Sequence, residues 1–207
     1  MPVRFAAGFA GVQVDGLSGT LWQGQAQLDA GHVATWDVAA QDSLLTRTLI
    51  FDVSVTGPQT ALHGRVALTP SQAVVGPLAG QAAWPLIAAV MPGLEITCDS
   101  VADVRIGALT LTVPRRGVGQ VTVNEGFCDR VDGTVTRVPV PALVARIATA
   151  DDGIEAVVTS DAVPLVTTRI TNANRALITI HAAGAAMVPG MPSSADSQID
   201  LPLALIR

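Results

Sequence analysis

Residues 49–68 read LIFDVSVTGPQTALHGRVAL, and this stretch decides the expected fold. In its first half, Leu49, Phe51, Val53 and Val55 alternate with polar residues, and in its second half apolar residues again occupy every second position. Side chains of a β-strand point to opposite faces in turn, so each half predicts a strand with one buried face. Gly57-Pro58 between the halves predicts a hairpin turn.

The same alternation recurs along the chain. It occurs in residues 102–106, 109–113 and 178–182. Turn signals separate the runs at Asp15-Gly16, Ala30-Gly31, Asp132-Gly133, Asp152-Gly153 and Asn172-Ala173-Asn174. The pattern predicts a mainly β fold in one domain over residues 1–207, with strongly curved antiparallel sheets of meandering hairpins.

Three short segments favour helices that cover the ends of a sheet. Residues 42–48 begin with an aspartate, and residues 85–90 begin with a proline, which the first turn of a helix tolerates. Residues 141–149 place Leu143, Val144 and Ile147 at helical spacing.

Charge and composition exclude some functions. All 12 basic residues are arginines, the net charge is −5, and no basic cluster exceeds Arg115-Arg116, so a nucleic-acid partner is not expected. No run of about 18 apolar residues occurs, so no transmembrane helix is expected within this chain. Mean hydropathy is +0.47 with 14% charged residues, which is typical of a surface that contacts a partner or lies near a membrane.

Cys98 and Cys128 are the two cysteines of the chain. One interpretation is a disulfide, which would place the chain in an oxidising compartment. The other is a pair of buried thiols. Two cysteines without a CxxC motif do not make a zinc site.

No motif for catalysis, for a metal or for a cofactor is found. His32, His63 and His181 are the histidines, and His63 and His181 fall on the polar positions of predicted strands, which favours solvated side chains. Asp151-Asp152 could in principle bind calcium, but a solvated turn is the better interpretation. The chain is therefore not expected to be an enzyme.

The tryptophans are the remaining candidates for functional residues. Trp22 lies in a predicted glycine-flanked strand over residues 20–24, and Trp36 ends a second alternating run. Anchoring of a core is the favoured interpretation, because each ring can bury about 150–250 Å². A groove for a lipid or for a partner strand is the alternative.

Residues 17–26, LSGTLWQGQA, resemble the GTLW-x-G-x-A signature of the type II secretion system protein N (GspN) family. Its residues here are Gly19, Thr20, Leu21, Trp22 and Gly24. Trp36 and Leu44-Leu45 follow at the spacing of that family, and residues 126–128 and 132–135 are similar to a later family feature.

The resemblance implies a non-enzymatic accessory component of the bacterial type II secretion system. It implies a periplasmic domain at the inner membrane, held by a single-pass anchor outside this chain, with an AsmA-like fold that carries an apolar groove. Expected partners are other secretion components, either the inner-membrane platform or the secretin. The alternative function is lipid binding or lipid transfer along the groove. The family supplies no catalytic or ligand-binding residues to assign here.

Overall fold

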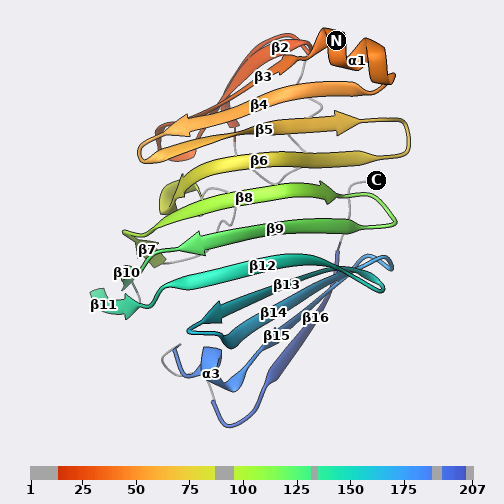
Figure 1. Ribbon diagram of the computed structural model, residues 1–207. Coiled ribbons are helices and arrows are strands. Elements are labelled where there is room, and N and C mark those ends of the chain that lie inside the picture. Colours follow the sequence, from red (N-terminus) through yellow and green to blue (C-terminus); the bar gives the residue numbers. More distant parts are fainter. Residues whose placement is uncertain (1–13, 87–95, 132–134, 188–192, 204–207) are drawn as a thin grey trace.

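The structure is a computed structural model that describes residues 14–86, 96–131, 135–187 and 193–203. It confirms the mainly β fold with antiparallel sheets and short helices. Thirteen strands form one sheet in the order β1-β2-β3-β4-β5-β6-β8-β9-β12-β13-β14-β15-β16 (Figure 1). Their bounds are β1 Val14–Gly19, β2 Gln23–Leu28, β3 His32–Val38, β4 Leu49–Gly57, β5 Thr60–Leu68, β6 Ala73–Ala83, β8 Val101–Thr110, β9 Arg116–Val123, β12 Leu143–Ala150, β13 Gly153–Ser160, β14 Val163–Thr171, β15 Arg175–Ile180 and β16 Ser197–Pro202.

The hairpin predicted from residues 49–68 forms as β4 and β5. Leu49 pairs with Leu68 and Val55 with Leu62, so the apolar residues of both strands share one face. Gln59 completes the turn with a φ of 52°. The alternation therefore predicted the register, because a slip by one residue would move every apolar side chain to the other face.

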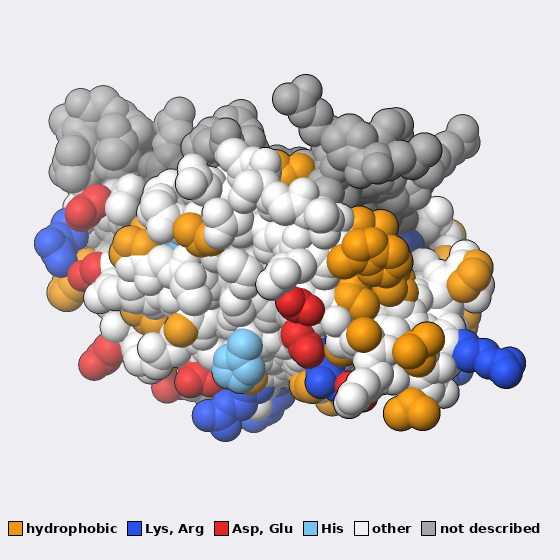
Figure 2. Space-filling model, turned by 90° about the horizontal axis from the view of Figure 1, so that it is seen from above, with side chains coloured by type: hydrophobic (Ala, Val, Ile, Leu, Met, Phe, Trp, Pro, Cys, Tyr) orange, Lys and Arg blue, Asp and Glu red, His pale blue; other side chains and the backbone are white. Residues whose placement is uncertain are grey.

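This pattern divides the sheet into an apolar and a polar face. The buried cluster of the apolar face consists of Ala82, Leu86, Ala102 and Val104, with half-buried residues of neighbouring strands around it. Polar side chains occupy the alternate positions. In Figure 2 charged side chains and a histidine gather along one side of the molecule.

Most side chains of the apolar face are only half-buried. The accessible surface of the molecule is 12728 Å² for 21.2 kDa, whereas a compact monomer of this mass exposes about 9000 Å². The half-buried side chains of the large sheet contribute to this excess.

A second, smaller sheet lies at the left of Figure 1 and consists of β7 Ile96–Cys98, β10 Gly126–Val131 and β11 Val135–Val140. Cys98 and Cys128 stand directly opposite each other on β7 and β10, with 4.0 Å between their Cα atoms, and they form a disulfide. The disulfide interpretation of the two cysteines is thus confirmed.

The helices agree only in part with the prediction. α1 Ala40–Thr46 covers most of the predicted segment 42–48, and the other short helices are η3 Asp29–Gly31 and α3 Ala182–Ala185. Residues 84–86 are helical, and the rest of the predicted helix 85–90 lies outside the described residues.

The helix predicted over residues 141–149 is wrong. This segment forms β12, which pairs with β9 on one side and with β13 on the other. Leu143, Ala145 and Ile147 also satisfy a period of two, and ladders on both edges outweigh the weaker helical spacing of Leu143, Val144 and Ile147.

One of the predicted turns is wrong. Asp15-Gly16 lies inside β1, at an irregularity in its pairing with β2. Residues 30–31, 58–59, 151–152 and 172–174 turn as predicted, and Asp132-Gly133 lies outside the described residues. None of the described helices is long and apolar enough to cross a membrane.

Arg115 ties two distant hairpins together at one end of the sheet. Its backbone N–H donates to Asn172 Oδ1 at 2.8 Å, and its guanidinium donates to Thr171 O and to Asn174 Oδ1, both at 2.6 Å. These contacts join the β8–β9 turn to the β14–β15 turn across the strands between them. Strong curvature of the sheet as a whole stays a prediction.

Candidate functional site

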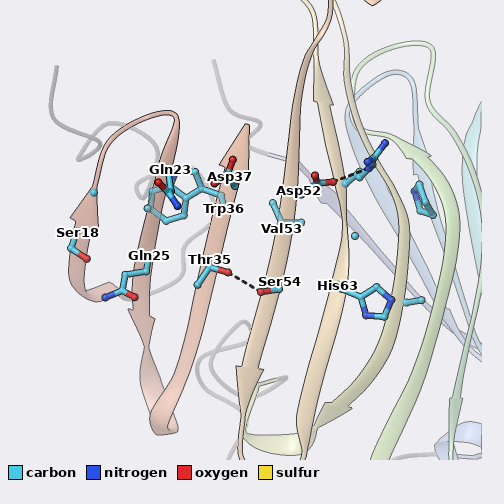
Figure 3. Close-up of a pocket in the computed structure, with 16 residues that line it drawn as sticks. Ser18, Gln23, Gln25, Thr35, Trp36, Asp37, Asp52, Val53, Ser54 and His63 are labelled. Carbon is cyan, nitrogen blue, oxygen red and sulfur yellow. Dashed lines mark hydrogen bonds and ion pairs between the residues drawn. The ribbon is translucent and has the colours of Figure 1, made fainter. Parts of the chain in front are cut away.

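A polar hollow lies on the polar face of strands β1 to β6 (Figure 3). Its cavity volume is about 860 Å³. The polar residues of its lining are Ser18, Gln23, Gln25, Thr35, Asp37, Asp52, Ser54, His63 and Arg65. A volume of this size is typical of ligand sites, and most of the lining surface is apolar although many of the lining residues are polar.

Strand register aligns the side chains of the hollow. Gln25 stands opposite Thr35, Thr35 opposite Ser54, and Ser54 opposite His63, so one polar row crosses four strands. The hydroxyl groups of Thr35 and Ser54 are 2.8 Å apart and share a hydrogen bond. The row follows from the alternation, because positions between apolar residues must face the other side of the sheet.

Arg65 organises one margin of the hollow. Its Nε donates to Asp52 Oδ1 and its Nη1 donates to Asp42 Oδ2, both at 2.8 Å. The hydrogen bond to Asp52, followed by the attraction of the same carboxylate, raises the pKa of Arg65 above its ordinary value, and Asp42 adds to the effect. Since Asp42 belongs to α1, this ion pair attaches α1 to the sheet.

Other polar groups of the hollow are free to contact a ligand. Ser18, Gln23, Gln25 and His63 make no side-chain hydrogen bond or ion pair with the described part of the chain. His63 is exposed, as predicted from its position on a polar face. Amides, hydroxyls and an imidazole offer both donors and acceptors, a set suited to a polar, uncharged surface of a partner.

Gly19, Thr20, Leu21, Trp22 and Gly24, which carry the resemblance described above, lie in or beside the turn next to this hollow. Thr20 Oγ1 accepts from the N–H groups of Trp22 and Gln23 at 3.2 Å each, and Thr20 N–H donates to Gln23 O at 2.7 Å. Gly19 adopts a φ of 102°, which a glycine reaches without a steric cost. The motif therefore encodes a defined β1–β2 turn.

Trp36 supports that turn from the apolar face. Its indole N–H donates to Thr20 O at 3.2 Å. A Cβ at Gly24 would collide with Cζ2 of the Trp36 ring, so the motif glycine leaves the space that the ring fills. Trp36 is half-buried and supports this turn, but it is not part of the buried cluster of the sheet.

The predicted anchoring of a core is wrong for Trp22. It lies in the turn between β1 and β2, and 59% of its surface is exposed, with Leu21 beside it at 50%. Its backbone carbonyl is held by the N–H of Val38, so the ring points outward from a fixed position. A two-residue interruption of the alternation at Leu21-Trp22 was the sequence signal for a turn here.

His181 is not a solvated histidine, contrary to the prediction. Its side chain is 24% exposed, its Nδ1 lies 2.8 Å from Asp196 Oδ2, and its Nε2 lies 2.9 Å from Thr167 Oγ1. Asp196 Oδ1 also accepts from the N–H of Ala182 at 3.0 Å. These two hydrogen bonds lower the pKa of Asp196, the bond from His181 more strongly than the bond from Ala182.

The order hydroxyl, imidazole and carboxylate is that of a hydrolytic triad, but the surroundings favour a structural role. An oxyanion hole needs free N–H groups near the nucleophile. The N–H of His181 donates to Leu165 O at 3.0 Å and that of Ala182 is bound to Asp196. The three side chains instead attach α3 and the segment before β16 to β14.

Within the described ranges, no group of three or more His, Cys, Asp or Glu residues could hold a metal ion. Asp151 and Asp152 form the β12–β13 turn. Comparisons with family models, with curated proteins and with solved structures gave no match.

Proposed function

We propose that this chain is a non-enzymatic accessory domain of the bacterial type II secretion system. It would act on the periplasmic face of the inner membrane, through contacts with the inner-membrane platform or the secretin. The turn built by Gly19, Thr20 and Gly24 supports the motif on which the resemblance rests. The disulfide supports an oxidising compartment.

One observation carries the proposed mode of contact, namely the edge strand β1 beside the polar hollow. Among the described strands, β1 pairs with β2 and with no other. Ser18 of β1 lines the hollow. A partner strand added to β1 would form main-chain hydrogen bonds, and the free amides and hydroxyls of the hollow would select its side chains.

In-cell photo-crosslinking tests this mode of contact. A photoreactive residue replaces Ser18 in β1 of the full-length protein, and a matched control carries it at Gln198 in β16, the other edge of the sheet. We expect adducts with secretion components from position 18 and none from position 198. Equal yields from both edges, or adducts that contain no secretion component, would contradict the proposal.

Lipid binding is the second candidate, and the half-buried apolar face favours it. Val55, Leu62, Ile106 and Val121 continue the apolar cluster across neighbouring strands. Acyl chains could cover such a face without any specific polar contact. Native mass spectrometry of the purified full-length protein should show a co-purified lipid if this candidate is correct, and its absence after extraction from membranes would count against it.

A further inference from the structure

One row of strand ends carries exposed apolar side chains in three of its connections. In an antiparallel meander every second turn lies at the same end of the strands. The β1–β2 turn, the β3–β4 connection with α1, and the β8–β9 turn therefore share one end of the sheet. The bonds of Arg115 to the β14–β15 turn agree with this assignment.

We call the exposed residues of these connections the apolar rim. They are Leu21, Trp22, Leu44, Leu45, Leu111 and Val113, with exposed fractions of 50%, 59%, 82%, 84%, 45% and 52%. The two leucines of α1 point away from the sheet, since none of the residues of that helix is buried. In Figure 2 a large cluster of hydrophobic side chains appears towards the right, the side on which α1 lies in Figure 1.

Charge is distributed unevenly around this rim. Arg47 and Arg116 are exposed at it, and neither forms an ion pair within the described part of the chain. Asp42 is the one carboxylate in its three connections, and it shares the guanidinium of Arg65 with Asp52. The β12–β13 turn at the same end of the sheet carries exposed Asp151 and Asp152, and the opposite strand ends carry exposed Glu125 and Asp161. At the three connections of the rim, Arg47, Arg115 and Arg116 outnumber Asp42, so the rim itself is locally basic.

The shape of the rim indicates its occupant. From β1 to β9 the sheet advances by seven strand spacings, or about 34 Å, so the apolar side chains form a row of separate tips. A protein interface usually needs a compact area of about 800 Å² on each partner. A bilayer surface accepts a row of tips, tryptophan favours its interfacial layer, and arginine binds lipid phosphates.

The geometry points to the apolar rim as a membrane-docking edge, which inserts its leucines and Trp22 at the boundary between headgroups and acyl chains. Arg47 and Arg116 contact the phosphates. This inference does not depend on the secretion role, because it concerns the lipid surface and not the partner at β1.

Sedimentation with vesicles tests the inference on the full chain. With vesicles of phosphatidylcholine and phosphatidylglycerol, we expect saturable binding that the double variant L44S/L45S weakens at least tenfold. The matched control V163S/M187S alters two residues of similar exposure, 48% and 43%, elsewhere on the molecule, and should bind like the unchanged protein. No binding by the unchanged protein, or equal losses in both variants, would overturn the inference.

Two further measurements locate the contact. Brominated phosphatidylcholine should quench the fluorescence of Trp22, and W22F should remove most of that quenching while Trp36 and Trp84 remain. R47Q/R116Q should reduce the gain from phosphatidylglycerol severalfold but leave binding to pure phosphatidylcholine unchanged. A lipid-independent dimer that L44S/L45S abolishes would instead assign the rim to self-association and overturn the inference.

Discussion

Two clusters at opposite strand ends of this sheet, the apolar rim and the His32–Thr60 pair, use their side chains in opposite ways. At the apolar rim, Leu44 and Leu45 are 82% and 84% exposed. At the opposite end, polar groups turn inward: His32 is 1% exposed and Thr60 4%. Their side chains are 3.1 Å apart, and Thr60 Oγ1 also accepts from the N–H of Ala83 at 3.0 Å.

Both clusters lie at connections between strands of the same sheet. Closing a hairpin therefore requires neither the exposed leucines of the apolar rim nor the buried His32 and Thr60. Exposed leucines contribute nothing to folding that a polar residue would not supply. Buried and hydrogen-bonded groups, by contrast, cost free energy when one partner is lost. The comparison teaches that the buried His32–Thr60 pair stabilises the fold, whereas the exposed leucines of the apolar rim are available for binding.

The largest effect on stability should come from the disulfide of the small sheet. Replacing Cys98 and Cys128 by alanine releases a constraint on the unfolded chain across a sequence separation of 30 residues. We expect the free energy of unfolding to fall by about 3–4 kcal/mol in the loop-entropy model. Urea unfolding under oxidising conditions measures it, and an unchanged midpoint would contradict the expectation.

Thr60→Val should have the next largest effect. Valine keeps the volume of threonine but removes the acceptor of the Ala83 N–H and the partner of the His32 ring. Leaving buried polar groups with fewer partners costs about 1–3 kcal/mol. Thr20→Val, in the exposed β1–β2 turn, is the control, and chemical denaturation should show a smaller loss for it than for Thr60→Val.

Acid should weaken the attachment of α3 through Asp196. Its pKa is lowered in the folded protein, so the carboxylate stabilises the fold at every pH above its unfolded value of about 3.9. This contribution declines as the pH falls below that value and is lost below the folded pKa. Thermal unfolding between pH 2 and pH 7 should show a smaller acid-induced drop for Asp196→Asn than for the unchanged protein.

The smallest effect on stability should come from the apolar rim itself. L44S/L45S removes side chains that α1 leaves exposed, so the free energy of unfolding should change by no more than about 0.5 kcal/mol. Urea unfolding beside Thr60→Val provides the contrast. A loss as large as that of Thr60→Val would show that the rim leucines support the fold and would remove the distinction between the two clusters.

Parts of the candidate site could be predicted from the sequence. The alternation of residues 49–68 predicted that Ser54 and His63 share the polar face, whereas the strand predicted around Trp22 is a turn. The hollow as a whole could not be predicted, because it needs the registers of β1 to β6 together. Asp196 was missed as the partner of His181, since 15 residues separate them and no local pattern joins them.

The sequence by itself determined the strands, the two faces of the sheet and the pair of cysteines available for a bond. These depend on a period of two and on a count, and both are local properties. Only the tertiary structure decided which turns share an end, because one misassigned element, such as the helix expected over residues 141–149, reverses every later end of the meander. It also decided that Trp22 is exposed and His181 half-buried, since burial depends on neighbours that only the folded chain brings close.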